Sequence, residues 1–266
     1  MGTLNGKIAV ITGAARGNGE GSAIVMAEKG ATVVLTDVMN TVHKTAKKII
    51  DNGYIADSFE MDVADTSQVS YVVKEVEKKF GRIDILVNNA GVINLVSLIN
   101  MVDEVRDRML DTNIKGVFNC TKAVLPGMMK RNYGKIVNLS SVTGPIVADA
   151  GETAYATTKA AIWGFTRALA IEVAQYGINV NAICPGMIET EMVKQMAMET
   201  DPNNPSRVIK QMASRIPLGR LGTIEELGEL VVFLASDRSS YLTGASIVMD
   251  GASTLPESGV FVPQSK

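Results

Sequence analysis

Short apolar runs rich in β-branched residues alternate with helical patterns along almost the whole chain of 266 residues. Glycine or polar residues bound these runs, which is typical of buried strands. Because strands that alternate with helices form parallel sheets covered on both faces, we expect an α/β protein with a doubly wound parallel sheet. The expected strands comprise residues 7–12, 32–36, 55–60, 83–87, 135–139, 178–183 and 245–249, and the expected helices include residues 17–29, 67–80, 103–131, 153–176 and 224–235.

The chain shows no linker, charged block or repeat that would divide it, so we expect a single domain over residues 1–266. Residues 187–214 differ from the rest because they are polar, rich in methionine and interrupted by Pro202 and Pro205. In doubly wound sheets the ligand crevice lies outside the carboxyl ends of the strands. Because this segment directly follows a strand, we expect it to form a helical substrate lid. Residues 252–266 are expected to form a C-terminal tail.

Composition excludes several classes of protein. A formal net charge of -2 gives no electrostatic reason to expect nucleic acid or an anionic membrane as a partner. Cys120 and Cys184 are too few for a disulfide framework or a metal site, which favours a reducing compartment. Neither a signal peptide nor an apolar stretch of membrane-spanning length is visible. We therefore expect a soluble, cytoplasmic protein with no metal.

Tyr155 and Lys159 stand one turn apart in an expected helix, so their side chains share a face. A free tyrosine, with a pKa of about 10, is a poor acid or base at neutral pH. A neighbouring cation favours the phenolate and brings that pKa into a useful range. Alone the pair is weak evidence, because both residues are ordinary on an exposed helix. Ser141, Asn113 and a glycine-rich turn at the N-terminus strengthen the interpretation as a proton-transfer pair.

The glycine-rich turn joins the first expected strand to the first helix. Gly13, Gly17 and Gly19 allow a tight turn and let the backbone approach a pyrophosphate at the positive end of the helix. Taken alone, such a loop is equally well a flexible turn. Here it has a strand before it, a helix after it, and Asp37 at the end of the second strand. The sequence therefore predicts a dinucleotide site.

Asp37 also indicates which dinucleotide is bound. A carboxylate at this position accepts hydrogen bonds from the adenosine ribose hydroxyls and repels a 2′-phosphate. Arg16 favours NADP instead, since a cation in the glycine turn can bind the 2′-phosphate. A solvated side chain at the edge of the turn is at least as good an interpretation of this residue. Residues 38–42 contain no basic side chain, so we expect NAD rather than NADP.

Further motifs follow the glycine turn in a fixed order: Asn88-Asn89-Ala90-Gly91, Asn113, Ser141, the Tyr155 and Lys159 pair, and Pro185-Gly186. Together with the turn they resemble the short-chain dehydrogenase/reductase family, over residues from about 6 to 251. The resemblance is greatest to bacterial NAD-type members, hydroxysteroid dehydrogenases among them, and it implies a Rossmann-type sheet. Asn18 departs from the family, which usually has a branched apolar residue at this position.

The resemblance implies four catalytic residues. Tyr155 would give or take the proton at the substrate oxygen, and Lys159 would lower its pKa and hold the nicotinamide ribose. Ser141, rather than Ser140, would hydrogen-bond the substrate oxygen. Asn113 would anchor a water that links Lys159 to solvent. This arrangement suits hydride transfer, because two hydroxyl donors stabilise the charge that develops on that oxygen.

The resemblance also implies contacts to the cofactor. Asp62 and Val63 would contact adenine, residues 89–91 would lie beside the adenosine ribose, and Ile188 and Thr190 would meet the carboxamide of nicotinamide. The full expected cofactor-binding set is Gly13, Arg16, Gly17, Asn18, Gly19, Asp37, Asp62, Val63, Asn89, Ala90, Gly91, Tyr155, Lys159, Pro185, Gly186, Ile188 and Thr190.

The expected substrate surroundings are apolar. Methionines of the expected lid either pack a helix onto the domain or form an adaptable cover over a bulky substrate. No arginine or lysine stands beside Ser141 to bind a charged group, which favours an uncharged secondary alcohol or ketone such as a hydroxysteroid. The apolar residues concerned are Met187, Met192, Met196, Met198, Val96, Leu98, Ile146 and Val147.

Three functions remain in competition. An NAD(H)-dependent oxidoreductase acting on a small-molecule alcohol or ketone explains most features. A 3-oxoacyl carrier-protein reductase usually goes with NADPH and a basic docking surface; Lys130, Arg131 and Arg167 supply some charge, but Asp37 counts against it. A non-catalytic dinucleotide-sensing protein would not need the four catalytic residues.

The family resemblance implies a homotetramer built through the helices of residues 103–131 and 153–176. The apolar part of the tail, residues 255–263, is expected to reach a neighbouring subunit or border its site. His43, far from the motifs, is expected to be a surface histidine.

Overall fold

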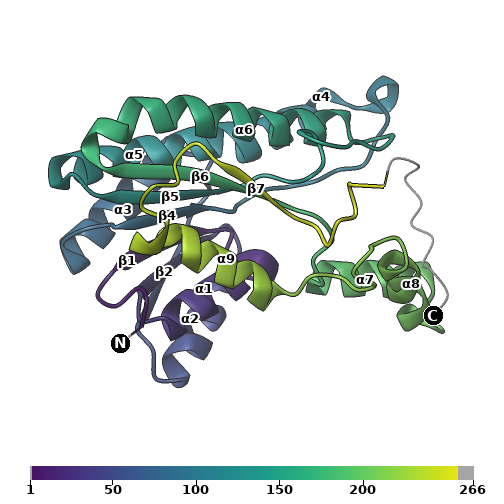
Figure 1. Ribbon diagram of the computed structural model, residues 1–266, viewed down its shortest axis with the longest axis horizontal. Helices are drawn as coiled ribbons and strands as arrows, with labels where there is room; N and C mark the ends of the chain where they lie inside the picture. Colours follow the sequence, from purple (N-terminus) through teal and green to yellow (C-terminus); the bar gives the residue numbers. More distant parts are fainter. Residues whose placement is uncertain (1, 257–266) are drawn as a thin grey trace.

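The computed structural model describes residues 2–256 and contains one seven-stranded sheet in the order β3-β2-β1-β4-β5-β6-β7 (Figure 1). Every pairing in this sheet is parallel. The structure thereby confirms the α/β fold with a Rossmann-type sheet and all seven expected strands. The strands are β1 (Ile8–Thr12), β2 (Thr32–Asp37), β3 (Ala56–Glu60), β4 (Ile85–Asn88), β5 (Gly134–Leu139), β6 (Ile178–Pro185) and β7 (Ser246–Met249).

Helices cover both faces of the sheet (Figure 1). Ala9 and Ile11 of β1 join a core cluster on one face, whereas Ile8 and Val10 join the cluster on the other. This alternation follows from the two-residue period of a strand. The first face is covered by α1 (Gly17–Glu28), α2 (Val42–Asp51) and α9 (Ile224–Ala235), and the second by α3 (Thr66–Phe80), α5 (Gly116–Arg131) and α6 (Thr153–Val173).

One expected helix is interrupted. Residues 103–131 form α4 (Asp103–Leu110), a π-helical turn over Asp111–Lys115, and then α5. In the turn the Gly116 backbone N–H bonds the Asp111 carbonyl, so one extra residue is inserted. The prediction of a single helix is wrong because a hydrophobic pattern does not reveal such an insertion, which is a common local feature of functional sites. The expected helix of residues 153–176 is α6 followed by a short 3-10 turn.

The segment expected to be a lid forms two short helices, α7 (Glu191–Thr200) and α8 (Pro205–Ala213). They extend beyond the carboxyl ends of the strands (Figure 1). Thr190 and Asn204 cap their N-termini, and Pro205 occupies the first turn of α8, where a proline costs no hydrogen bond. Of the expected tail, residues 252–256 follow β7, and the remainder lies outside the described residues.

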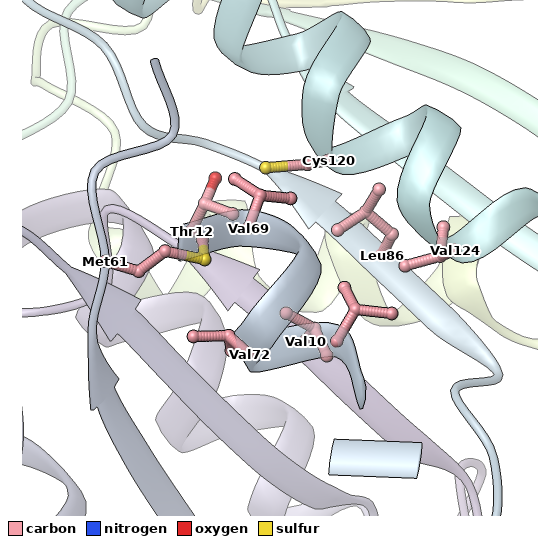
Figure 2. Close-up of a pocket in the computed structure, with 9 residues that line it drawn as sticks. Val10, Thr12, Met61, Val69, Val72, Leu86, Cys120 and Val124 are labelled. Carbon is pink, nitrogen blue, oxygen red and sulfur yellow. The ribbon is translucent and has the colours of Figure 1, made fainter. Parts of the chain in front are cut away.

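The order of the strands reverses beside β1. The chain passes from β1 through β2 and β3 to one edge, and β4 then returns to the other side of β1. Such a reversal opens a crevice at the carboxyl ends of the two strands. Figure 2 shows a different space, a void among Val10, Leu86 and Cys120 between the sheet and the helices α3 and α5. Its volume of about 10 Å³ holds at most a single water, so it belongs to the core.

Of the part of the chain that is described, no helix has both the length and the apolar character needed to cross a membrane. His43 lies on α2 at the surface, where its ring approaches Ser58 and Glu60. The expectation of a surface histidine is confirmed.

Candidate active site at the carboxyl edge of the sheet

The glycine turn is fixed by steric contact with the segment after β4. At Gly13, whose φ is 64°, a Cβ atom would lie 2.7 Å from the Ala90 Cα. At Gly19 a Cβ atom would lie 2.2 Å from the Gly13 carbonyl oxygen. The Asn89 side-chain amide donates to the carbonyls of Thr12 and Gly13, at 2.9 Å each. Residues 89–91 therefore lie against the turn, and Asn89 holds its backbone in place.

The first turn of α1 has free hydrogen-bond donors. Arg16 precedes it in an extended conformation and makes no side-chain cap, whereas Asp65 caps α3 and Thr223 caps α9. The initial backbone N–H groups of an uncapped helix, together with its dipole, attract an anion. The side-chain oxygen of Asn18, in the same turn, is buried and has no partner. These groups fit a bound dinucleotide with its pyrophosphate at the start of α1.

Asp37 ends β2 beside the glycine turn. Its two carboxylate oxygens accept hydrogen bonds from the backbone N–H groups of Ala15 and Met39, each at 3.0 Å. A carboxylate has lone pairs beyond these two, so ribose hydroxyls can still be bound. The carboxylate thus orients the glycine turn and still has lone pairs free at the carboxyl end of β2. Arg16 is exposed at the edge of the turn.

Asp62 and Val63 follow β3, next to β2. The Asp62 carboxylate accepts from the Ala64 N–H at 2.8 Å, and the Asn119 side chain donates to the Val63 carbonyl at 2.8 Å. Val63 is buried against Gly116, where a Cβ atom would lie 2.5 Å from Val63 Cγ2. The two residues are therefore held beside the carboxyl end of β2, where the resemblance places adenine.

The segment after β6 joins the sheet to the lid. Gly186 lies so close to Asp250 that a Cβ atom would be 2.8 Å from the Asp250 Cβ. Ile188 pairs with Gly222 in an isolated parallel bridge. A Cβ atom at Gly17 would lie 3.7 Å from the Thr190 methyl carbon, so the start of α7 faces the glycine turn. The structure thus brings the two predicted ends of the cofactor site to one crevice.

The catalytic candidates lie where α6 meets the end of β5. The Lys159 Nζ atom is buried and donates to the Leu139 carbonyl at 2.8 Å, while Ser140 Oγ donates to the Lys159 carbonyl at 2.8 Å. Ser141 Oγ accepts the Thr143 N–H at 3.1 Å and lies close enough to the Tyr155 phenol to offset part of the rise in its pKa that burial causes. Ser140 is therefore used to attach α6 to the sheet, and Ser141 is the serine that meets the tyrosine.

Asn113 is fully buried within the π-helical turn. Its side-chain amide donates to the Val92 carbonyl at 2.9 Å and to Thr158 Oγ1 at 3.0 Å, and its oxygen accepts the Val92 N–H at 2.7 Å. Both amide hydrogens are thus engaged within the protein. The side chain can meet the expected water only through the second lone pair of its oxygen, so its evident role is to join residues 91–92 to α6.

The pKa values of the pair are governed by burial. Burial raises the pKa of the Tyr155 phenol, the nearby Ser141 hydroxyl opposes this, and the charge of Glu152 adds to it. Burial lowers the pKa of the Lys159 ammonium to about 8, although the nearby Cys184 opposes the change. The sequence predicted a lowered tyrosine pKa. In the structure the Lys159 nitrogen lies 5.7 Å from the centre of the Tyr155 ring, and desolvation of the phenol dominates.

Several residues of this site could not be recognised from the sequence. Thr158, Ser140 and the Leu139 carbonyl hold Asn113 and Lys159 in place. Thr158 stands next to Lys159 in the sequence, but an ordinary helical threonine gives no signal. Cys184 is a buried thiol at the end of β6, and burial raises its pKa. Its proximity to Lys159 depends on the pairing of β5 with β6.

The rim of the crevice is apolar and exposed. The four lid methionines are between 42 and 59% exposed, and Ala197 is the buried residue of α7, so the methionines do not pack this helix onto the domain. On the opposite side the Val96 N–H bonds the Gly151 carbonyl at 3.0 Å, which joins the loops after β4 and β5. The exposed apolar residues of the rim are Met187, Met192, Met196, Met198, Leu98, Ile146 and Val147.

Within residues 2–256 there is no group of three or more histidine, cysteine, aspartate or glutamate side chains arranged to hold a metal ion.

A family model described as enoyl-(acyl carrier protein) reductase matches residues 13–254. With this match and the relatives below, the chain belongs to the short-chain dehydrogenase/reductase family. Its members are oxidoreductases that act on alcohols and ketones with a nicotinamide dinucleotide, and this protein is an enzyme of that class with a small-molecule substrate.

Two curated relatives are similar over nearly their whole length. Oxidoreductase UcpA of Escherichia coli O157:H7 is 53% identical over 97% of this chain and 98% of its own. A 3-oxoacyl-[acyl-carrier-protein] reductase of Thermotoga maritima is 42% identical over 93% and 98%. Among solved structures, levodione reductase has a TM-score of 0.88 at 31% identity, covering 94% of this chain and 98% of its own. A short-chain dehydrogenase/reductase of Mycobacterium marinum has a TM-score of 0.87 at 36% identity, covering 95% and 97%.

The lowered pKa of Lys159 predicts a pH-dependent stability. The Lys159 amine of the unfolded chain loses its proton at a higher pH than the buried amine of the folded protein. Above about pH 8 the folded protein therefore binds fewer protons than the unfolded chain, and the stability of the folded protein rises with pH. Below pH 8 the amine is charged and the full cost of burying that charge lowers the stability; above pH 8 the amine loses its proton and this cost disappears. We expect the thermal midpoint of the wild type, relative to Lys159→Met, to rise by roughly 5 °C between about pH 7 and about pH 9.5.

Lys74→Met, the same substitution at an exposed position of α3, is the control and should show no such relative rise. The raised pKa values of Tyr155 and Cys184 act in the opposite direction at alkaline pH. Burial is the main cause of both and is present in both proteins, so this part cancels in the difference, whereas the smaller effect of the Lys159 charge on Cys184 does not. A midpoint difference that is constant with pH would contradict the burial of a charged amine.

Proposed function

We propose that the protein is an NAD(H)-dependent oxidoreductase that interconverts a secondary alcohol and a ketone, with a hydroxysteroid or a similar apolar molecule as substrate. The observation that carries the proposal is the convergence of two sets of groups on one crevice. Asp37 and the uncapped start of α1 lie at its dinucleotide end. Ser141, Tyr155 and Lys159 lie where the β5 edge meets α6.

A bound dinucleotide would donate a hydride to the carbon bearing the substrate oxygen in the reduction, and accept it from that carbon in the oxidation. Tyr155 is a phenol at neutral pH, since the ordinary pKa of tyrosine is about 10 and burial raises it further, and the phenol is the form that donates a proton to a ketone oxygen. Ser141 donates a second hydrogen bond to the same oxygen. The Lys159 ammonium, buried beside them, favours negative charge at this point. Asn113 and Thr158 keep these groups in position.

The apolar rim supports the choice of substrate class. In the wall formed by residues 92–102 and 141–152, exposed aliphatic side chains such as Ile146 and Val147 face solvent, and the lid adds its methionines. We propose that α7 and α8 form a lid over the bound substrate. Burying these side chains against an apolar molecule gains about 25 cal/mol for each Å² removed from water. Methionine suits such a cover because its flexible thioether adapts to different shapes.

A second candidate function is favoured by the 42% identity to the 3-oxoacyl-[acyl-carrier-protein] reductase of Thermotoga maritima. Oxidation of NADH and reduction of NAD⁺ should therefore be followed spectrophotometrically with hydroxysteroids and bile acids, acetoin-like ketones and 3-oxoacyl thioesters. Turnover of steroids with a markedly higher kcat/KM than the thioesters supports the proposal, and the reverse order favours the second candidate.

Tyr155→Phe tests whether the site is catalytic. We expect kcat to fall by at least about 100-fold, because the proton donor is lost while the ring remains, with a much smaller change in the affinity for NADH. Tyr71→Phe, at an exposed position of α3, is the control and should leave kcat unchanged. An unaltered function of Tyr155→Phe in the cell would instead support the non-catalytic, dinucleotide-sensing protein.

The two neighbouring serines form a matched pair of variants. Ser141→Ala should lower kcat by about 100-fold, because a donor to the reacting oxygen is removed. Ser140→Ala should lower the unfolding free energy by about 1 kcal/mol through loss of its bond to the Lys159 carbonyl, with a smaller effect on kcat. Steady-state kinetics and urea unfolding of both variants measure this difference. A large fall in kcat for Ser140→Ala, with a loss of stability for Ser141→Ala, would show instead that Ser140 is the serine that contacts the substrate oxygen.

Asp37 is proposed to set the preference for NAD. We expect kcat/KM with NAD⁺ to exceed that with NADP⁺ by at least about 100-fold, since like charges about 4 Å apart repel by about 4 kcal/mol near a protein surface. Asp37→Asn retains an acceptor for the Ala15 N–H and should reduce the preference. Asp37→Ala should also reduce it, but should lower kcat/KM with both cofactors because the turn loses this bond. Equal kcat/KM values for the wild type would refute this role.

We also propose a homotetramer built through α5 and α6. An apolar hollow of about 170 Å³ lies between the two helices, and Phe118, 53% exposed, packs edge-on against Phe165 at a centroid distance of 4.6 Å. Light scattering of the wild type should give four times the mass of one chain. Phe118→Asp should lower that mass because a charge cannot be buried there. Tyr71→Asp is the control, and a monomeric wild type would exclude the proposal.

A further inference from the structure

The side-chain oxygen of Asn18 has no hydrogen-bond donor within the described part of the protein. Its Oδ1 atom is buried and has no hydrogen-bond partner, although its backbone carbonyl accepts the Ser22 hydroxyl at 2.7 Å. Buried polar atoms are almost always paired, because leaving one unpaired is costly. A branched apolar residue, which the family usually has here, would avoid this cost. The asparagine therefore requires a partner that comes from outside the chain.

The position of Asn18 in the glycine turn limits which groups of a bound dinucleotide can donate a hydrogen bond to it. Ala15, earlier in the turn, bonds the Asp37 carboxylate, whereas Gly17 faces Thr190 at the start of α7. Asn18 directly follows Gly17, the residue of the turn that faces the start of α7. An oxygen that accepts hydrogen bonds cannot pair with a pyrophosphate, which offers only acceptors. The remaining donors of a dinucleotide on the α7 side are its nicotinamide ribose hydroxyls and its carboxamide.

We propose that Asn18 Oδ1 accepts a hydrogen bond from the nicotinamide half of the bound dinucleotide. This inference rests on the proposed function, because it requires that the crevice binds a dinucleotide. Without the dinucleotide the buried oxygen has no donor among the described residues of the protein, and binding supplies one. Asn18 thus lowers the stability of the free protein and raises its affinity for the cofactor.

The test compares binding and stability in Asn18→Leu, which has the same branching without polar atoms. The dissociation constants of NAD⁺ and of ADP, which lacks the nicotinamide half, are measured by isothermal titration calorimetry. Loss of one hydrogen bond should weaken NAD⁺ binding by about five-fold and leave ADP binding unchanged. The thermal midpoint of the free protein should rise, because the unpaired oxygen is gone. Asn18→Ala, a smaller side chain, should show the same loss of NAD⁺ affinity.

Asn52→Leu, the same substitution at an exposed asparagine after α2, is the control and should alter neither dissociation constant. A raised midpoint with unchanged affinity for NAD⁺ would overturn the inference, since the residue would then matter only to the fold. Equal losses for NAD⁺ and ADP would overturn its placement at the nicotinamide half. A wild type that binds neither NAD⁺ nor NADP⁺ would instead refute the proposed function, which the variants alone cannot do.

Discussion

The site depends on the hydrogen bonds that join the ends of β1 and β4 across the point where the strand order reverses. Thr12 Oγ1 accepts the backbone N–H groups of Asn89 and Ala90, at 3.1 and 3.0 Å, and the Asn89 side chain donates back to the turn. Asn113 accepts the Val92 N–H just beyond, and a Cβ atom at Gly91 would lie 3.7 Å from the Lys159 nitrogen. One continuous set of contacts therefore links the glycine turn to Lys159 on α6.

Desolvation determines the electrostatics of the catalytic end. It raises the pKa of Tyr155 and lowers that of Lys159, so both charged forms are disfavoured in the free protein. The phenol is thereby kept as a proton donor, while the amine remains mostly protonated at neutral pH because its pKa is still about 8. The hydrogen bond from Lys159 to the Leu139 carbonyl offsets part of the cost of burying the charge.

Much of the fold could be predicted because its signals are local. Most of the seven strands are short, largely apolar runs, and their alternation with helices implies a parallel sheet. The π-helical turn at Asp111–Lys115 could not be predicted, since one inserted residue leaves the hydrophobic period almost intact. The direction of the Tyr155 pKa was also mistaken. A sequence places a cation one helical turn away, but the burial of the phenol depends on segments distant in the chain.

The sequence by itself determined the class of protein, because glycine spacing, strand periodicity and the order of polar motifs are properties of the chain. It also singled out Asn18 as an unusual residue. Only the tertiary structure decided that Ser140 anchors α6 while Ser141 meets Tyr155, that Asp37 bonds the glycine turn, and that the Asn18 oxygen is unpaired. Each of these facts is a matter of distance and burial between segments far apart in the chain, and such distances exist only once the parallel strands have brought their carboxyl ends together.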